Sequence, residues 1–160
     1  ALDRVVSEVM TDLQLVIEET RAEIVIGALP TIDADPTQMR MLFQNLLSNA
    51  LKYRRPDQPP KVCICVPDGE PGEARIGDRV TIVVSDNGIG FEMKYADRIF
   101  AIFQRLHGRN EYEGTGIGLA TCRKIVERHG GSIDVDSTIG RGSEFRVNLP
   151  LKQAFVETVQ

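Results

Sequence analysis

Apolar residues recur at helical spacing near the start of the chain. Between residues 2 and 17 they fall three or four positions apart, which predicts an amphipathic helix. The stripe consists of Leu2, Val5, Val6, Val9, Leu13, Val16 and Ile17. A short strand is predicted in "AEIVIG", and a second helix is predicted from Pro36 to about Tyr53, with Asp35 as its N-cap. Its core stripe consists of Met39, Leu42, Phe43, Leu46, Leu47 and Ala50.

Strand-like patterns dominate the rest of the chain. The segments "KVCICV" and "RVTIVVS" are predicted strands joined by a polar loop, and "SIDVDS" and "SEFRVNLP" are two closing strands. Helical patterns cover about residues 95–103 and the segment "TGIGLATCRKIVERHGG", which ends at Gly130. This order predicts an α+β (α/β sandwich) fold, with three helices on one face of a mixed, mostly antiparallel sheet of about five strands.

Size and composition are those of one globular domain. At 160 residues the chain can bury a sizeable core, and we assign residues 1–150 to a single domain and 151–160 to a C-terminal tail. The sequence is 42% hydrophobic and 26% charged, without the run of about 20 apolar residues that a membrane helix needs. Because "ALDRVVSEVM" lacks an initiator Met and already has a helical pattern, we expect a piece of a longer protein.

Charge and cysteine content exclude two classes of function. A net charge of −4 without a basic cluster argues against nucleic acid as a partner. Of the three cysteines, Cys63 and Cys65 alternate along one strand and are expected to be small buried hydrophobes on one face. No second Cys/His cluster completes a four-ligand metal site. Free thiols favour a reducing compartment, so we expect a cytoplasmic protein with no membrane insertion of this segment.

The second helix carries a polar column beside its core stripe, made of Asn45, Asn49 and Lys52. A single Asn on a helix is usually solvated or bonded to nearby backbone. Two amides and an ammonium in line instead indicate a site. An amide oxygen can coordinate a hard cation such as Mg²⁺, and a Lys can neutralise phosphate.

Two further segments carry residues suited to binding a ligand. Asp86 directly follows an apolar strand in "VVSDNGIGF", where Gly88 and Gly90 permit close backbone approach. The plain alternative is an ordinary turn, but a buried Asp86 needs a donor, and the amine of a base would serve. In "EGTGIGLATCRKIV", glycines precede a helix whose N–H groups can face an anion. The spacing matches neither a Walker loop nor a dinucleotide fingerprint, and "IGRGSEF" alone is typical of a hairpin turn.

Taken together and in this order, the motifs resemble the catalytic, ATP-binding domain of sensor histidine kinases, in the GHKL superfamily that also holds type II topoisomerase, chaperone and mismatch-repair ATPases. "NLLSNALKY" resembles the N box, "DNGIG" the first glycine box and "IFAIFQRL" the F box. "GTGIGLA" and "GRGSEF" resemble the second and third glycine boxes. The resemblance covers residues 2–150, and the segment "FQRLHGRNEYEGTGIGLA" is most similar to the sequences of kinases related to phytochromes.

The resemblance implies roles for residues around the base. Asp86 would bind the adenine amino group, Gly88 and Gly90 would shape the base pocket, and Ser143 would lie near the base.

It also implies roles on the phosphate side. Asn49 would hold Mg²⁺ and Asn45 would lie towards the phosphates, while Lys52 and Tyr53 would contact phosphate and nucleotide. Arg105 would approach the terminal phosphate. Residues 107–113 would form a lid, and the residues closing over the triphosphate would be Gly114, Gly116, Gly118 and Leu119.

Asn45 separates this chain from relatives that hydrolyse ATP. Those relatives carry a Glu at the matching position, and an amide cannot take a proton from water at useful pH. Losing a general base typically costs about 10² to 10⁴ in rate, so hydrolysis by this domain should be slow. Neither His107 nor His129 is followed by an acidic residue, as the family's phosphoacceptor is.

The resemblance therefore implies the ATP-binding half of a two-component histidine kinase. It would bind ATP with Mg²⁺ and pass the γ-phosphate to a histidine on a separate dimerisation domain, absent from these residues, for relay to a response regulator. The full-length protein would be a homodimer. The alternatives are a GHKL ATPase or clamp, a serine kinase like the anti-sigma factors, and a degenerate domain that only binds. Asn45 argues against the first two, because both carry or tend to carry Glu there, and the intact Asp86 and Asn49 argue against decay.

Overall fold

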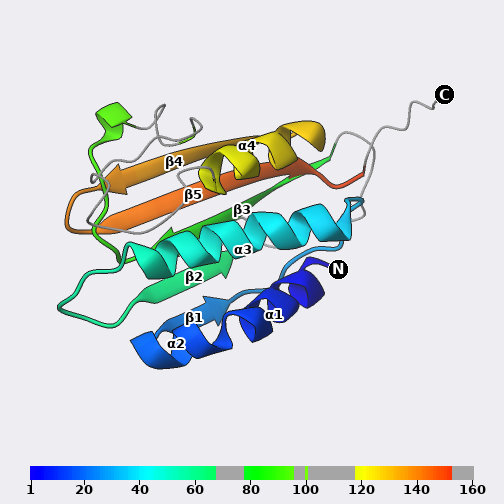
Figure 1. Cartoon of the computed structure of the whole chain (residues 1–160). Helices are drawn as coiled ribbons and strands as arrows, with labels where there is room; N and C mark the ends of the chain where they lie inside the picture. The colour runs from blue at the N-terminus through cyan, green and yellow to red at the C-terminus, as the bar shows by residue number, and fades with distance from the viewer. Residues whose placement is uncertain (68–77, 96–99, 101–117, 153–160) are drawn as a thin grey trace.

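Two layers make up the structure, a five-stranded sheet and a set of helices on one of its faces (Figure 1). The computed structural model describes residues 1–67, 78–95, 100 and 118–152. In chain order the elements are α1 (Leu2–Asp12), α2 (Gln14–Thr20), β1 (Glu23–Ile26), α3 (Pro36–Lys52), β2 (Lys61–Cys65), β3 (Arg79–Asp86), the 3-10 helix η1 (Met93–Tyr95), α4 (Gly118–Arg128), β4 (Ser132–Thr138) and β5 (Gly142–Pro150).

The strand order is β1-β2-β3-β5-β4. β1 runs parallel to β2, and every other neighbouring pair is antiparallel, which confirms the mixed, mostly antiparallel sheet. Parallel neighbours need a crossover, and α3 lies in the connection between β1 and β2. As a result, α3 lies across the middle of the covered face, with α1 on one side and α4 on the other (Figure 1).

The first predicted helix is two helices in the structure. The chain leaves helical geometry at Leu13, where φ is −100° and ψ is 8°. Leu13 is itself buried in the core, whereas α2 beyond it has no buried residue and leaves Leu15 67% exposed. Beyond Leu13, Ile17 still packs against the core while Val16 is exposed, and the prediction of one continuous helix was wrong at this point.

Helix α3 begins as predicted. The Asp35 side chain accepts a hydrogen bond from the Gln38 N–H at 3.1 Å, and Pro36 occupies the first turn, where its missing N–H costs nothing. The backbone N–H of Asp35 is held in turn by Nε2 of the buried His129, at 3.1 Å. His129 thus ties the start of α3 to the end of α4.

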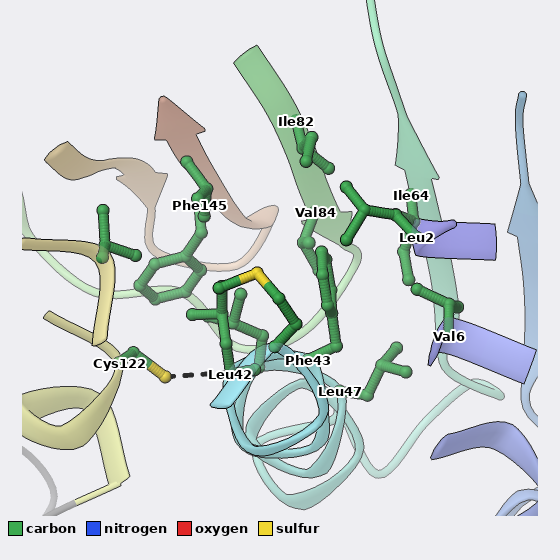
Figure 2. Close-up of a cluster of buried hydrophobic side chains, with 14 of the residues drawn as sticks. Leu2, Val6, Leu42, Phe43, Leu47, Ile64, Ile82, Val84, Cys122 and Phe145 are labelled. Atoms are coloured by element: carbon green, nitrogen blue, oxygen red, sulfur yellow. Dashed lines mark hydrogen bonds between the residues drawn. The ribbon is translucent and has the colours of Figure 1, made fainter. Parts of the chain in front are cut away.

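The core lies between α3 and the sheet (Figure 2). All six residues of the predicted stripe are buried, and Leu51 joins them. Phe43 and Leu42 face strand residues such as Val84 and Phe145, and the Cys122 thiol of α4 donates to the Leu42 carbonyl oxygen at 3.7 Å. This packing fixes α3 and α4 against the same sheet face, where their ends can meet.

None of the described helices covers the opposite face of the sheet, and here the prediction that the cysteines are buried was wrong. Cys63 and Cys65 do share one face of β2, but both are half-buried rather than buried. Val62 and Ile64 take the covered face of the strand, so the alternation of β2 leaves the thiols on the uncovered one.

Strand β5 ends at Pro150, and the residue after it is packed against the domain. Leu151, assigned to the tail, is 2% exposed, and its backbone bonds to Asp33 and Asp78. Among the described helices, none is both long and apolar enough to cross a bilayer.

Candidate functional site

A row of polar side chains ends the covered face of the sheet on three neighbouring strands. Apolar residues fill that face along most of its length, and one cross-strand row is Val84, Phe145 and Val135. Two positions further along each strand the same face carries Asp86 on β3, Ser143 on β5 and Ser137 on β4. We call these three residues the polar row. The sequence pattern indicated Asp86 and the family resemblance implied Ser143, whereas neither pointed to Ser137.

Asp86 is held by backbone donors on one of its two oxygens. Oδ1 accepts from the Gly88 N–H at 2.8 Å and from the Ser143 N–H at 3.3 Å. Among the described residues, no protein donor reaches Oδ2. Burial raises the pKa of Asp86 above its usual range, and the two backbone hydrogen bonds lower it in part. The carboxylate therefore has an acceptor oxygen in a desolvated position, available to a donor on a ligand.

Glycines let backbone segments approach Asp86 closely. Gly90 adopts a φ of +67°, and a Cβ there would overlap the Thr138 carbonyl oxygen. Gly88 is needed for space instead, since a Cβ would lie 2.6 Å from the Tyr53 carbonyl oxygen. The close approach predicted for both glycines is present. Gly142, in the segment given a turn interpretation, has a φ of +122° and packs against the backbone of Asp86.

The end of α3 meets the loop that follows β3, residues 87–92. The Tyr53 carbonyl oxygen accepts from the Ile89 N–H at 3.0 Å, which places the last turn of α3 beside Asp86 and Gly88. Asn49, Lys52 and Tyr53 are all half-buried. The structure thus brings the end of the predicted polar column to the same place as the polar row.

Asn45 lies one turn earlier in α3 and faces the start of α4. A Cβ at Gly118 would lie 3.5 Å from the Asn45 side-chain oxygen. Between described residues, no hydrogen bond engages the side-chain amide of either Asn45 or Asn49. Leu119 follows in the first turn of α4 and packs against the core.

Part of the predicted site lies outside the described residues. This applies to Arg105, Gly114 and Gly116 and to the predicted lid at 107–113. The described part combines a carboxylate, two amides, a Lys and the start of an eleven-residue helix, whose first N–H groups favour an anion.

Arg55 connects the loops around the polar row, and the sequence held no signal for it beyond "RRP" after a helix. Its Nε donates to the Asn87 carbonyl oxygen and its Nη1 to the Gly140 carbonyl oxygen, both at 2.8 Å. The Gly140 N–H donates to the Ile89 carbonyl oxygen, also at 2.8 Å. One guanidinium therefore joins the end of α3, the 87–92 loop and the β4–β5 turn at residues 139–141.

We expect Arg55→Ala to lower the free energy of unfolding by about 1–3 kcal/mol, because hydrogen bonds to a charged donor are lost at two carbonyls. Urea unfolding measures this effect. Arg54→Ala is the matched control, since Arg54 bonds only to Leu51 within its own helical turn among the described residues, and this variant should change stability much less. Equal effects of the two variants would contradict the joining role of Arg55.

Comparison with known proteins adds family information to this geometry. Residues 34–153 match the family described as histidine kinase-, DNA gyrase B-, and HSP90-like ATPase. Cyanobacterial phytochrome A from Nostoc sp. (strain PCC 7120) is 43% identical over 150 residues, which cover 94% of this chain and 19% of that protein. The circadian input-output histidine kinase CikA from Synechococcus elongatus (strain PCC 7942) is 40% identical over 129 residues, covering 79% and 16%. The chain thus spans about a fifth of the length of such relatives.

Solved structures share the fold. The mycobacterial sensor histidine kinase MprB superposes with a TM-score of 0.75 at 22% identity, over 95% of this chain and 97% of that one. Full-length ShkA, solved in complex with AMPPNP, gives a TM-score of 0.76 at 27% identity, over 96% of this chain and 31% of that one.

Proposed function

The chain belongs to the histidine kinase-, DNA gyrase B- and HSP90-like ATPase family, and from this premise we propose that it is the ATP-binding half of a two-component histidine kinase. It binds ATP with Mg²⁺ and donates the γ-phosphate to a histidine on a separate dimerisation domain. A response regulator then receives the phosphate. The full-length protein works as a cytoplasmic homodimer, with neither nucleic acid nor membrane lipid as a partner of this segment.

The Asp86 carboxylate carries this proposal. Its Oδ1 is occupied by two backbone N–H groups, which leaves Oδ2 to accept from the exocyclic amine of adenine. A hydrogen bond to a charged acceptor contributes about 1.5–3 kcal/mol, and desolvation of the site favours its full value. Gly88 and Gly90 allow the backbone to come close enough to enclose a flat base.

Phosphates would lie between α3 and the start of α4. The first N–H groups of α4 attract an anion, and Lys52 supplies a positive charge from the end of α3. Leu119 would pack beside the triphosphate. Arg105, Gly114 and Gly116 would complete this side, as the resemblance of their motifs implies.

The residues fit a magnesium ion. Mg²⁺ takes oxygen ligands and usually keeps several waters, so one or two protein oxygens and the phosphates suffice. The half-buried Asn49 amide, without a hydrogen bond to a described residue, would supply such an oxygen. When bound, the ion neutralises charge on the phosphate oxygens and orients them for transfer.

Asn45 and His129 explain why the domain would hold ATP rather than consume it. Asn45 faces the start of α4, but its amide cannot act as a general base, so water is not activated there. His129 is buried with Nε2 bonded to the Asp35 N–H and Nδ1 2.7 Å from the Ile125 carbonyl oxygen. Since both ring nitrogens are engaged, His129 is no nucleophile. An ATPase, an ATP-driven clamp or a serine kinase would instead be expected to carry a carboxylate at position 45.

Calorimetric titration with ATP, with and without Mg²⁺, tests the proposed binding, and Asn49→Asp tests the metal role. A carboxylate beside phosphate repels the nucleotide when the metal is absent and binds the metal well when it is present. We expect the ratio of the Kd without Mg²⁺ to the Kd with Mg²⁺ to rise about tenfold, equivalent to about 1.4 kcal/mol.

Gln44→Glu is the matched control for this variant, because it makes the same amide-to-carboxylate change on the exposed side of α3. Its ratio should stay at the wild-type value. An unchanged ratio in Asn49→Asp would remove Asn49 from the metal site, and a wild-type chain that binds no ATP would overturn the proposed function.

A further inference from the structure

The hydroxyl of Ser137 is buried at the end of β4 and has three hydrogen-bond partners. Ser137 is only 7% exposed. Its Oγ accepts from the Phe91 N–H at 3.0 Å, donates to the Gly142 carbonyl oxygen at 2.9 Å, and lies 2.9 Å from Oγ of Ser143. These partners come from the 87–92 loop and from the start of β5, the two segments that also enclose Asp86.

The protons of this cluster can be counted. A serine hydroxyl has one proton and two lone pairs. The Ser137 proton goes to the Gly142 carbonyl, and one lone pair accepts from Phe91 N–H. The remaining lone pair can only accept. The 2.9 Å separation of the two hydroxyl oxygens alone allows either of them to donate, and assigning the Ser137 proton to the Gly142 carbonyl makes Ser143 the donor.

This hydrogen bond uses the single proton of the Ser143 hydroxyl on the neighbouring strand, β5. With its single proton directed at Ser137, Ser143 has only lone pairs left for a ligand. Ser143 also lies directly beside Asp86, because its backbone N–H bonds to Oδ1 of that carboxylate. The polar row thus presents acceptors alone from Asp86 Oδ2 and Ser143 Oγ.

From this arrangement we propose that Ser137 is a specificity-determining residue: by fixing the direction of the Ser143 hydroxyl, it makes the edge of the base site accept an amine and reject a carbonyl. The inference rests on the proposed function and refines it. A purine with an amino group at position 6 donates to this edge, whereas one with a carbonyl there meets lone pairs. Ser137 itself need not touch the nucleotide, so it acts as a positioning residue.

Without the Ser137 hydroxyl, Ser143 is released. Its hydroxyl can then rotate and donate towards the ligand, so a carbonyl at position 6 is no longer opposed by both groups. A purely structural role for Ser137 would instead loosen the site for every nucleotide alike. The ratio of two affinities therefore separates the two roles, whereas a single affinity does not.

The experiment compares ATP with inosine triphosphate, which carries a carbonyl in place of the 6-amino group and a proton on N1. The N1 difference is the same for the wild type and for the variant, so the change in preference between the two proteins reports on Ser137. Calorimetric titration of both nucleotides in the presence of Mg²⁺ gives their Kd values for the wild type and for Ser137→Ala. We expect the wild type to prefer ATP and the preference to fall about three- to tenfold in Ser137→Ala. Ser137→Thr keeps a hydroxyl and should keep the wild-type preference.

Equal weakening of both nucleotides in Ser137→Ala would overturn the inference and leave the proposed function standing. No binding of ATP by the wild type would overturn the proposed function and the inference with it. Ser143→Ala removes the acceptor directly and should lower the preference as well, with no further fall when Ser137→Ala is added. If Ser137→Ala does not fold, an unchanged preference in Ser143→Ala overturns the inference.

Discussion

Replacing Asp86 by Asn is expected to abolish measurable nucleotide binding while leaving the fold at least as stable as the wild type. The Asn oxygen can still accept from the Gly88 and Ser143 N–H groups that now bond to Oδ1. The other position becomes an NH₂ donor facing the donor amine of adenine. A charged hydrogen bond of about 1.5–3 kcal/mol is lost and two donors meet, so affinity should fall by at least about a hundredfold.

The stability half of this expectation follows from the raised pKa of Asp86. A carboxyl whose pKa is higher in the folded than in the unfolded state contributes stability that is full below the unfolded pKa. That contribution is lost as pH rises through the folded pKa. Above its folded-state pKa the ionised Asp86 therefore lowers the free energy of unfolding relative to an uncharged side chain, and the neutral Asn removes this cost.

The same raised pKa sets the pH dependence of binding in the wild type. Protonation removes the charged acceptor, so ATP affinity should weaken as the pH falls towards the pKa of Asp86. This pKa lies above that of an ordinary Asp. Titration calorimetry measures affinity, and urea unfolding measures stability. Asp57→Asn, at an exposed position in the loop after α3, is the control and should change neither. Unchanged ATP affinity in Asp86→Asn would refute the base pocket.

Local sequence chemistry was enough to predict much of the helical layer. The stripe of α3 was predicted position by position, because helical periodicity and burial coincide in a helix packed on a sheet. Its start was predicted from Asp35 and Pro36, which satisfy the helix end within four residues. Gly130 likewise marked the end of α4 through its positive φ of +80°.

Features that depend on distant partners could not be predicted in this way. The chain leaves helical geometry at Leu13 although Leu13 and Ile17 both contact the core, and the helical periodicity of the apolar residues continues through this break. The alternation of Cys63 and Cys65 predicted a shared face but not that helices would cover the other one.

The candidate site shows the same division. Short sequence motifs indicated Asp86, Asn49 and the glycines. No short motif indicated Arg55 or Ser137. The hydrogen bonds of Arg55 reach residues 32 and 85 positions away in the chain. Those of Ser137 reach a loop and a strand that only the folded sheet brings beside it. Only the register of β4 on β5 places Ser137 opposite Ser143.

Transfer of phosphate is expected to need a second domain. We expect no transfer in the absence of that domain and clear transfer in its presence. In the proposed function the chain would bind ATP, and the described residues offer neither a general base at position 45 nor an available histidine nitrogen at position 129. The proposed histidine-bearing dimerisation domain of the full-length protein would give the γ-phosphate an acceptor. Asp86→Asn in this chain, and replacement of the acceptor histidine by Ala in the other, are controls that should each remove the signal.

Incubation with radiolabelled ATP, followed by separation of the two polypeptides and a test for acid-labile phosphate, measures this transfer directly. We expect no label on this chain by itself and label on the histidine-bearing domain once the two are mixed. Acid-labile label on this chain alone, or no label on the added domain although this chain binds ATP, would contradict its assignment as the nucleotide-holding half of a histidine kinase.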